Sequence, residues 1–183
     1  PMNDSEGHKI LFIGQPHEMD GYLENITCFF SALDELNFPF TLFIRDHPNN
    51  LSEKYSGMVA NYEYDCTILN KNDSIENALY HADLVVTCCS TAGFDHAYMQ
   101  YYSEKILGRL LYLSIGVDMA AFFKTHVGNI TIAELTNGMG EVAHSKAEIK
   151  TNIVDLLHYN KCDYKDSVDK NLENSGDSSN KIY

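Results

Sequence analysis

The chain has 183 residues, of which 44% are hydrophobic and 21% charged, and its formal net charge is −13. This length and composition are typical of one globular domain that buries a substantial core. The strong negative charge argues against a nucleic-acid-binding surface, which needs clustered Lys and Arg. It does not exclude a phosphorylated small molecule, because the N-terminus of a helix binds anions without net positive charge.

Targeting and cross-linking signals are absent from the sequence. No apolar run approaches the roughly 20 residues that span a bilayer, and the start, PMNDSEGHK, lacks the basic and apolar regions of a signal peptide. We expect residues 1–8 to be a disordered or artificially added start. The cysteines are odd in number and show no paired metal-ligand spacing, so we expect reduced thiols, a cytoplasmic location and no zinc site. They are Cys28, Cys66, Cys88, Cys89 and Cys162.

Short apolar runs alternate along the chain with segments in which apolar residues recur every three or four positions. The predicted strands are 9–15, 40–46, 66–70, 83–89, 109–115 and, as a candidate sixth, 128–133. The predicted helices are 21–37, 52–62, 74–82, 90–103, 117–126 and 145–160. This alternation predicts a doubly wound, Rossmann-like α/β fold, with a parallel sheet of five to six strands and helices on both faces.

The domain is expected to cover residues 9–160. The segment 161–183 is polar and poor in large aliphatic residues, which predicts a flexible or loosely docked tail. In an open parallel sheet, ligands bind beyond the carboxyl ends of the strands. Several of the segments that follow the predicted strands are polar, and we expect them to converge on one crevice.

The segment that follows the fourth predicted strand, Ser90-Thr91-Ala92-Gly93, is a candidate phosphate site. The N–H groups at a helix start point outward, two hydroxyls add donors, and Gly93 allows close approach of a phosphate. Asp95, about one turn further on, is placed to accept hydrogen bonds from ribose hydroxyls. The alternative is a helix N-cap followed by a solvated first-turn acid. Neither the P-loop pattern nor G-x-G-x-x-G is present.

His47, which follows the second predicted strand, is the candidate catalytic residue. Pro48 favours an extended backbone at His47, and the imidazole is suited to donate to a phosphate oxygen or to act as an acid or base. Arg45 adds positive charge nearby. The alternative is a turn with a structural histidine. A hydrolase triad of Ser90, His47 and Asp95 is disfavoured, because the sequence lacks a G-x-S-x-G elbow.

Four stretches in order carry a family resemblance: KILFIGQP, FTLFIRDHPNN, SIENALYHADLVVTCCSTAGFDHA and RLLYLSIG. Together they resemble the C-terminal, donor-binding half of GT-B glycosyltransferases. The likeness is to bacterial surface-polysaccharide enzymes that have an H-P motif followed by an S-T motif, including capsule and teichoic-acid enzymes. The UDP-N-acetylglucosamine 2-epimerases share the architecture. The resemblance spans roughly residues 9–159.

The resemblance implies roles for single residues. His47 would contact the donor phosphate or the leaving nucleotide, Ser90 and Thr91 would bind phosphate, and Asp95 would bind ribose. Gly14 would let the backbone approach the donor or the acceptor. No metal or other cofactor is expected, since there is no D-x-D motif and the substrate itself is the nucleotide-sugar.

In such enzymes the site lies between two halves, and the acceptor half is absent from this sequence. The resemblance therefore implies an acceptor domain or a partner subunit. From the negative charge and the short apolar runs we expect no nucleic acid and no transmembrane segment, while peripheral contact with a membrane stays compatible with the sequence. Two other hypotheses remain open. One is a non-catalytic module that binds a nucleotide or a partner, and the other is a fragment similar to a sugar-nucleotide epimerase.

Overall fold

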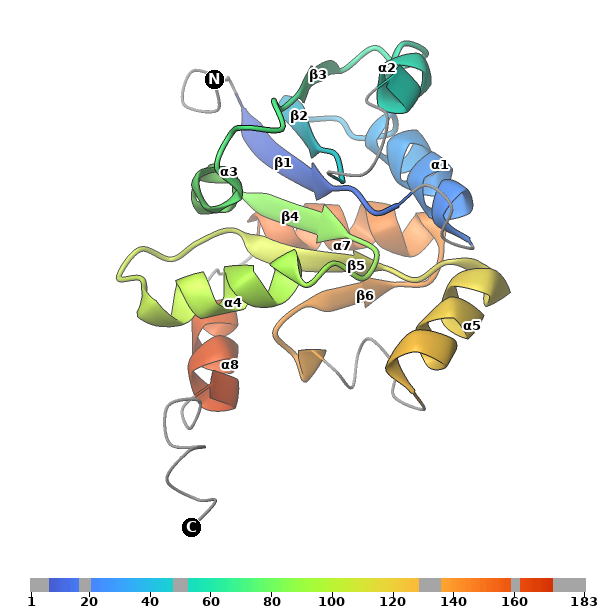
Figure 1. Cartoon of the computed structure of the whole chain (residues 1–183). Helices are drawn as coiled ribbons and strands as arrows, with labels where there is room; N and C mark the ends of the chain where they lie inside the picture. Colours follow the sequence, from blue (N-terminus) through green and yellow to red (C-terminus); the bar gives the residue numbers. More distant parts are fainter. Residues whose placement is uncertain (1–6, 17–20, 48–52, 129–135, 159–161, 173–183) are drawn as a thin grey trace.

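The computed structural model describes residues 7–16, 21–47, 53–128, 136–158 and 162–172 (Figure 1). Six parallel strands form one sheet in the order β3-β2-β1-β4-β5-β6. The strands are β1 His8–Ile13, β2 Phe40–Arg45, β3 Asp65–Ile68, β4 Leu84–Thr87, β5 Arg109–Leu113 and β6 Glu141–Ala143. The helices are α1 Tyr22–Leu33, α2 Glu53–Val59, α3 Ile75–His81, α4 Ala92–Tyr102, α5 Gly116–Val127, α7 Lys146–His158 and α8 Cys162–Leu172.

The strand order reverses between β1 and β4. From β1 the chain builds outward to β2 and β3, then crosses back and builds the other side through β4, β5 and β6. In the register of the two central strands, Ile10 lies opposite Leu84 and Ile13 lies opposite Thr87. Their carboxyl ends therefore lie side by side, and this is the topological switch point of a doubly wound sheet (Figure 1).

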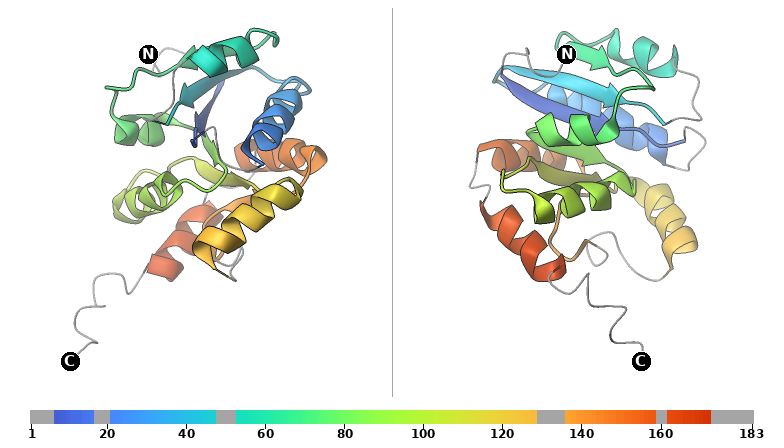
Figure 2. Two further views of the ribbon diagram at one scale, coloured as in Figure 1. Left: turned by 45° about the vertical axis from the view of Figure 1, so that its right-hand side comes forward. Right: turned by 60° about the vertical axis from the view of Figure 1, so that its left-hand side comes forward.

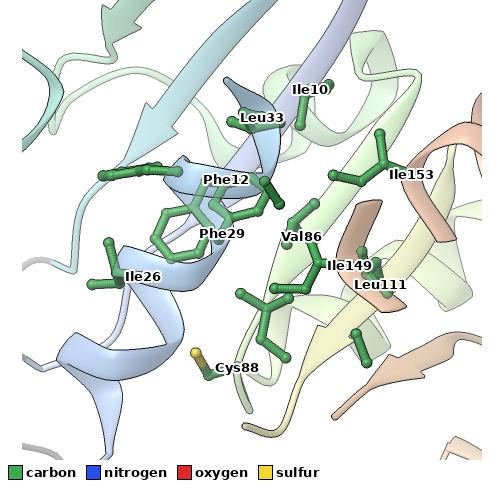
Figure 3. Close-up of a cluster of buried hydrophobic side chains, with 14 of the residues drawn as sticks. Ile10, Phe12, Ile26, Phe29, Leu33, Val86, Cys88, Leu111, Ile149 and Ile153 are labelled. Carbon is green, nitrogen blue, oxygen red and sulfur yellow. The ribbon is translucent and has the colours of Figure 1, made fainter. Parts of the chain in front are cut away.

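Both faces of the sheet are covered by helices, because alternate side chains of each strand point to opposite faces. Figure 2 shows α1 and α7 on one side of the sheet and α3 and α4 on the other. On the α1 side, Phe12 of β1 stacks on Phe29 at a centroid distance of 5.2 Å, and Ile149 of α7 joins the same core (Figure 3). The predicted fold class is confirmed.

The structure contains two described elements that the sequence did not predict. The sixth strand is Glu141–Ala143, whereas the predicted strand 128–133 lies, apart from Gly128, outside the described residues. A strand of three residues shows no hydrophobic pattern of its own, and it is defined by its pairing with β5, where Leu113 lies opposite Ala143.

The second element lies in the predicted tail, of which the structure describes residues 162–172. These residues form helix α8, which packs on α4 through a small apolar cluster that includes Ala97, Tyr164 and Val168. Two buried side chains four residues apart occupy one face of a helix and dock it, although most of the segment is polar. Among the described helices, none is long and apolar enough to cross a bilayer.

A buried histidine joins α4 to α8. His96 is fully buried, its Nδ1 hydrogen-bonds Tyr164 Oη at 2.8 Å, and its Nε2 has no hydrogen-bond partner among the described residues. Burial lowers the pKa of His96 to about 4, because the charged imidazolium is poorly solvated there. The ring is therefore neutral in the folded protein at neutral pH.

This arrangement predicts a loss of stability in acid. The folded pKa of His96 lies below its ordinary value of 6.5, so its contribution falls as the pH drops below 6.5, by up to about 3 kcal/mol near pH 4. His96→Phe is expected to flatten this part of the pH dependence, measured by urea unfolding at several pH values. The exposed His126→Phe is the control and is expected to follow the wild type. If the free energy of unfolding of His96→Phe and of the wild type depends on pH in the same way, buried His96 does not cause the loss of stability in acid.

Candidate functional site

The carboxyl ends of β1 and β4 are joined by side chains. Thr87, at the end of β4, is buried and donates its hydroxyl to the carbonyl of Ile13 at 3.1 Å. Two residues further along each segment, the Cys89 thiol donates to Gln15 Oε1, with an Sγ–Oε1 distance of 3.5 Å. The candidate crevice is therefore bounded by a connected set of polar groups from both halves of the sheet.

Gly14 is buried at the end of β1, and close packing of neighbouring groups explains why this position has no side chain. Its N–H donates to the carbonyl of Arg45 at 2.8 Å. A Cβ atom there would lie 2.7 Å from Tyr55 Oη and 3.2 Å from Asp46 Oδ1, closer than a side chain tolerates. The predicted reason for the glycine was approach of a ligand, whereas the groups that come this close belong to the protein itself.

His47 lies where the sequence predicts it, directly after β2 and half-buried. Its N–H donates to Oδ1 of the buried Asp46 at 2.7 Å, and the same N–H group lies 3.2 Å from the position of a Cβ on Gly14. The structure thus brings Gly14 and His47 together. Pro48 lies outside the described residues.

Arg45 has a structural contact that the sequence does not predict. Its Nη1 donates to the carbonyl of Asn70, and its Nη2 donates to the carbonyl of Lys71 at 2.7 Å. The guanidinium therefore holds the loop that follows β3. The predicted role of Arg45 in binding phosphate gains no support from this geometry, because two of its donors are directed to backbone oxygens.

At the start of α4 the helix-cap alternative is present. Ser90 Oγ accepts a hydrogen bond from the Ala92 N–H at 3.2 Å, and the Ser90 carbonyl accepts one from Gly93 at 3.1 Å. The Thr91 side chain, in contrast, is exposed and makes no capping hydrogen bond. Ser90 is thus partly used by the helix, while the Thr91 hydroxyl is open to solvent.

Gly93 is buried against β5 and is also explained by packing. A Cβ atom there would overlap Tyr112 Oη and lie 2.9 Å from Tyr112 Cζ. The absence of a side chain lets α4 approach the sheet, which was not the predicted reason. Asp95 is exposed one turn into α4, as a ribose-binding residue would need to be, whereas the neighbouring His96 faces the core.

The start of α5 is occupied by a carboxylate of the protein. Gly116, the first residue of α5, has φ +79°, and a Cβ there would overlap the Glu24 carboxylate of α1. A carboxylate at this position is favoured by the helix dipole and repels a further anion. Of the two helices that begin at the carboxyl ends of β4 and β5, α4 is therefore the better place for a phosphate.

The described side chains at the switch point support neither a metal site nor thiol chemistry. Within the part of the chain that the structure describes, no group of three or more His, Cys, Asp or Glu side chains is arranged to hold a metal ion. Burial raises the pKa of Cys89 to about 11, so the thiol is neutral at physiological pH and is a poor nucleophile.

A cavity of about 440 Å³ lies at the amino ends of β5 and β6, away from the carboxyl ends of the strands. Arg109 and Glu141, which begin β5 and β6, line it together with residues of α7. None of the predicted site residues belongs to its lining. The switch point and not this cavity is therefore the place where the predicted residues meet.

The sequence does not single out the groups that connect the site. Gln15 and Thr87 bridge β1 and β4, and the hydroxyls of Tyr22 and Tyr55 lie beneath the loops that follow β1 and β2. Gln15 was recognisable as a polar residue after a strand. The two tyrosines carry no local signal, because their hydroxyls meet only when α1 and α2 have packed on the sheet.

Comparison with known proteins gives a result at the level of the fold. No protein-family model matches the chain, and no curated protein sequence matches it. Among solved structures, a Listeria monocytogenes protein assigned as a UDP-N-acetylglucosamine 2-epimerase has a TM-score of 0.56 and 18% identity, and the match covers 93% of this chain and 40% of that one. The wall teichoic acid polymerase TagF has a TM-score of 0.59 and 13% identity, with coverages of 94% and 40%.

A third structure, S. aureus MnaA with UDP, has a TM-score of 0.58 and 10% identity, and the match covers this whole chain and 48% of MnaA. The chain thus spans less than half the length of each of these proteins. At such low identity the likeness shows a shared fold, which agrees with the Rossmann-like α/β fold expected from the sequence.

The explanation of Gly93 by packing is testable. Gly93→Ala is expected to lower the free energy of unfolding by about 1–3 kcal/mol, because the new methyl group overlaps the Tyr112 hydroxyl. Tyr112→Phe removes that oxygen, so the double variant is expected to be more stable than the sum of the single effects, measured by urea unfolding. Strictly additive effects would show that the Tyr112 hydroxyl is not what excludes a side chain at position 93.

Proposed function

We propose that this chain is the donor-binding half of a GT-B-type glycosyltransferase, which moves a sugar from a nucleotide-sugar to a polysaccharide or lipid-linked acceptor. One observation carries the proposal. The loops after β1, β2 and β4 meet at the topological switch point, which is where ligands bind in sheets of this kind. The structure of MnaA with UDP shares the fold, which makes UDP the first nucleotide to test.

The proposed roles follow from what each group presents. Thr91 presents an exposed hydroxyl at the start of α4, where backbone N–H groups and the helix dipole favour a phosphate. Ser90 assists from the same turn, and Asp95 accepts hydrogen bonds from the ribose. His47, across the switch point, donates a proton or a hydrogen bond to the departing phosphate and so stabilises the charge that develops there.

The proposed reaction needs a second half. The solved structures that share the fold are more than twice as long as the matched segment, which is consistent with an acceptor domain or a partner subunit that completes the site. We expect no metal ion in the transfer, since helix dipole and imidazole together provide positive potential at the leaving group.

A non-catalytic nucleotide-binding or partner-binding module is the second candidate function. It is favoured by the use of Arg45, Ser90 and Gly93 in the protein's own packing and hydrogen bonds. An epimerase-like fragment is a third candidate, since the Listeria monocytogenes protein shares the fold. All three candidates involve the same crevice, and they differ in whether transfer or epimerisation follows when the missing half is supplied.

Nucleotide binding is the direct test. Calorimetric titration with UDP, CDP, CMP and GDP is expected to give saturable binding of one of them. His47→Ala and Thr91→Val are each expected to weaken that binding by about tenfold, because each removes a hydrogen bond to a charged phosphate. Thr125→Val, which changes a hydroxyl on α5 that donates within its own helix, is the matched control.

Absence of binding by the wild type at millimolar nucleotide would contradict the donor-site proposal. Binding that is unaffected by both His47→Ala and Thr91→Val would place the nucleotide elsewhere on the protein.

A further inference from the structure

Two buried tyrosine hydroxyls meet beneath the candidate crevice. Tyr22 is the first residue of α1 and Tyr55 belongs to α2, and both side chains are fully buried. Their hydroxyl oxygens hydrogen-bond to each other. The Tyr55 ring packs edge-to-face on Phe12, which a phenylalanine at position 55 would do equally well. The hydroxyls are therefore not needed to fill the core.

The Tyr22 hydroxyl holds Gln15 at the switch point. It accepts a hydrogen bond from the Gln15 N–H at 2.8 Å. The Gln15 side chain donates from Nε2 to the carbonyl of Gly14 at 3.2 Å and accepts from the Cys89 thiol at the end of β4. A backbone fixed by Tyr22 thus presents a side chain that spans the space between β1 and β4.

The Tyr55 hydroxyl lies under the loop that carries His47. A Cβ on Gly14 would lie 2.7 Å from Tyr55 Oη and 3.2 Å from Asp46 Oδ1, so all three groups share one small space. Asp46 Oδ1 in turn accepts the His47 N–H. One hydroxyl pair therefore adjoins the loops after both β1 and β2, and those loops belong to two different βα units.

Both hydroxyls keep their protons. Burial raises the pKa of Tyr22 and of Tyr55, because a phenolate is poorly solvated in the core, and the nearby Asp46 carboxylate raises the pKa of Tyr55 further. The pair is therefore a neutral hydrogen-bonding element at neutral pH. A buried hydroxyl that lost its partner would cost about 1–3 kcal/mol, which keeps the arrangement fixed.

We propose that Tyr22 and Tyr55 are positioning residues for the nucleotide site, and that their hydroxyl pair holds Gln15 and the His47 loop in the geometry that a bound nucleotide meets. This inference rests on the proposed function. The two tyrosines do not contact the nucleotide, and they act through the backbone of Gln15 and through the surroundings of Asp46.

The test compares three tyrosine-to-phenylalanine variants of the full chain. Tyr22→Phe and Tyr55→Phe are each expected to raise the Kd of the nucleotide by about fivefold or more, in calorimetry well below the melting temperature. Tyr22→Phe is also expected to speed amide hydrogen exchange at Gln15. Tyr64→Phe is the matched control, because the Tyr64 hydroxyl is buried without a hydrogen-bond partner among the described residues and lies at the amino side of β3.

A second control separates positioning from loss of stability. Val168→Ala removes buried methyl groups from the cluster between α4 and α8. It is expected to lower the free energy of unfolding and to leave Kd and Gln15 exchange unchanged. If Val168→Ala weakens nucleotide binding as much as the tyrosine variants do, positioning is refuted.

The remaining outcomes distinguish this inference from the proposed function. Wild-type protein that binds none of the nucleotides defeats the proposed function and this inference with it. Wild-type protein that binds a nucleotide, with Kd unchanged in Tyr22→Phe and Tyr55→Phe, defeats the positioning role alone.

Discussion

The pairing of β1 with β4 is the constraint on which the site depends. Four consecutive residues of β1 pair with Leu84–Thr87 in parallel register, although the paired residues lie 74 positions apart in the sequence. Backbone hydrogen bonds in the ladder and burial of both faces fix this register, since a slip of one residue would exchange the side chains of the two cores. The carboxyl ends of β1 and β4, and the loops that follow them, are held side by side as a result.

Many of the polar side chains at the carboxyl ends of the strands interact with other parts of the protein itself. Arg45 fixes the loop after β3, Ser90 caps the first turn of α4, and Glu24 occupies the start of α5. The groups that remain for a ligand are fewer than the sequence suggests: His47 is half-buried, and Thr91 and Asp95 are exposed. The proposed contacts with a ligand are therefore limited to the start of α4 and the imidazole of His47.

The pattern of the sequence was sufficient to predict the fold class, because near-continuous apolar strands alternate with amphipathic helices of clear periodicity. It was also sufficient to place His47, Thr91 and Asp95 near the carboxyl ends of strands. It failed for β6, whose three residues are defined by pairing with β5, and for α8, which docks through a few apolar side chains, chiefly Tyr164 and Val168, within a polar segment.

The reason why positions 14 and 93 are occupied by glycine could not be predicted from the sequence either. From the sequence, Gly14 is expected to allow the approach of the donor or the acceptor and Gly93 the approach of a phosphate, yet Tyr55 and Tyr112 fill the space beside them. Those tyrosines are 41 and 19 residues away in the sequence, so only the packed structure shows the contacts. Local patterns identify which residues lie at a strand end, whereas three-dimensional packing decides which of them remain accessible to a ligand.

The most direct measurement is a titration of isotope-labelled protein with UDP, followed by the backbone amide chemical shifts. The account predicts that the largest shifts occur after β1, β2 and β4, at Gln15, at His47 and at residues 90–95. Shifts confined to the cavity at the amino ends of β5 and β6, around Arg109 and Glu141, would contradict the account. So would the absence of shifts with each of UDP, CDP, CMP and GDP at millimolar concentration.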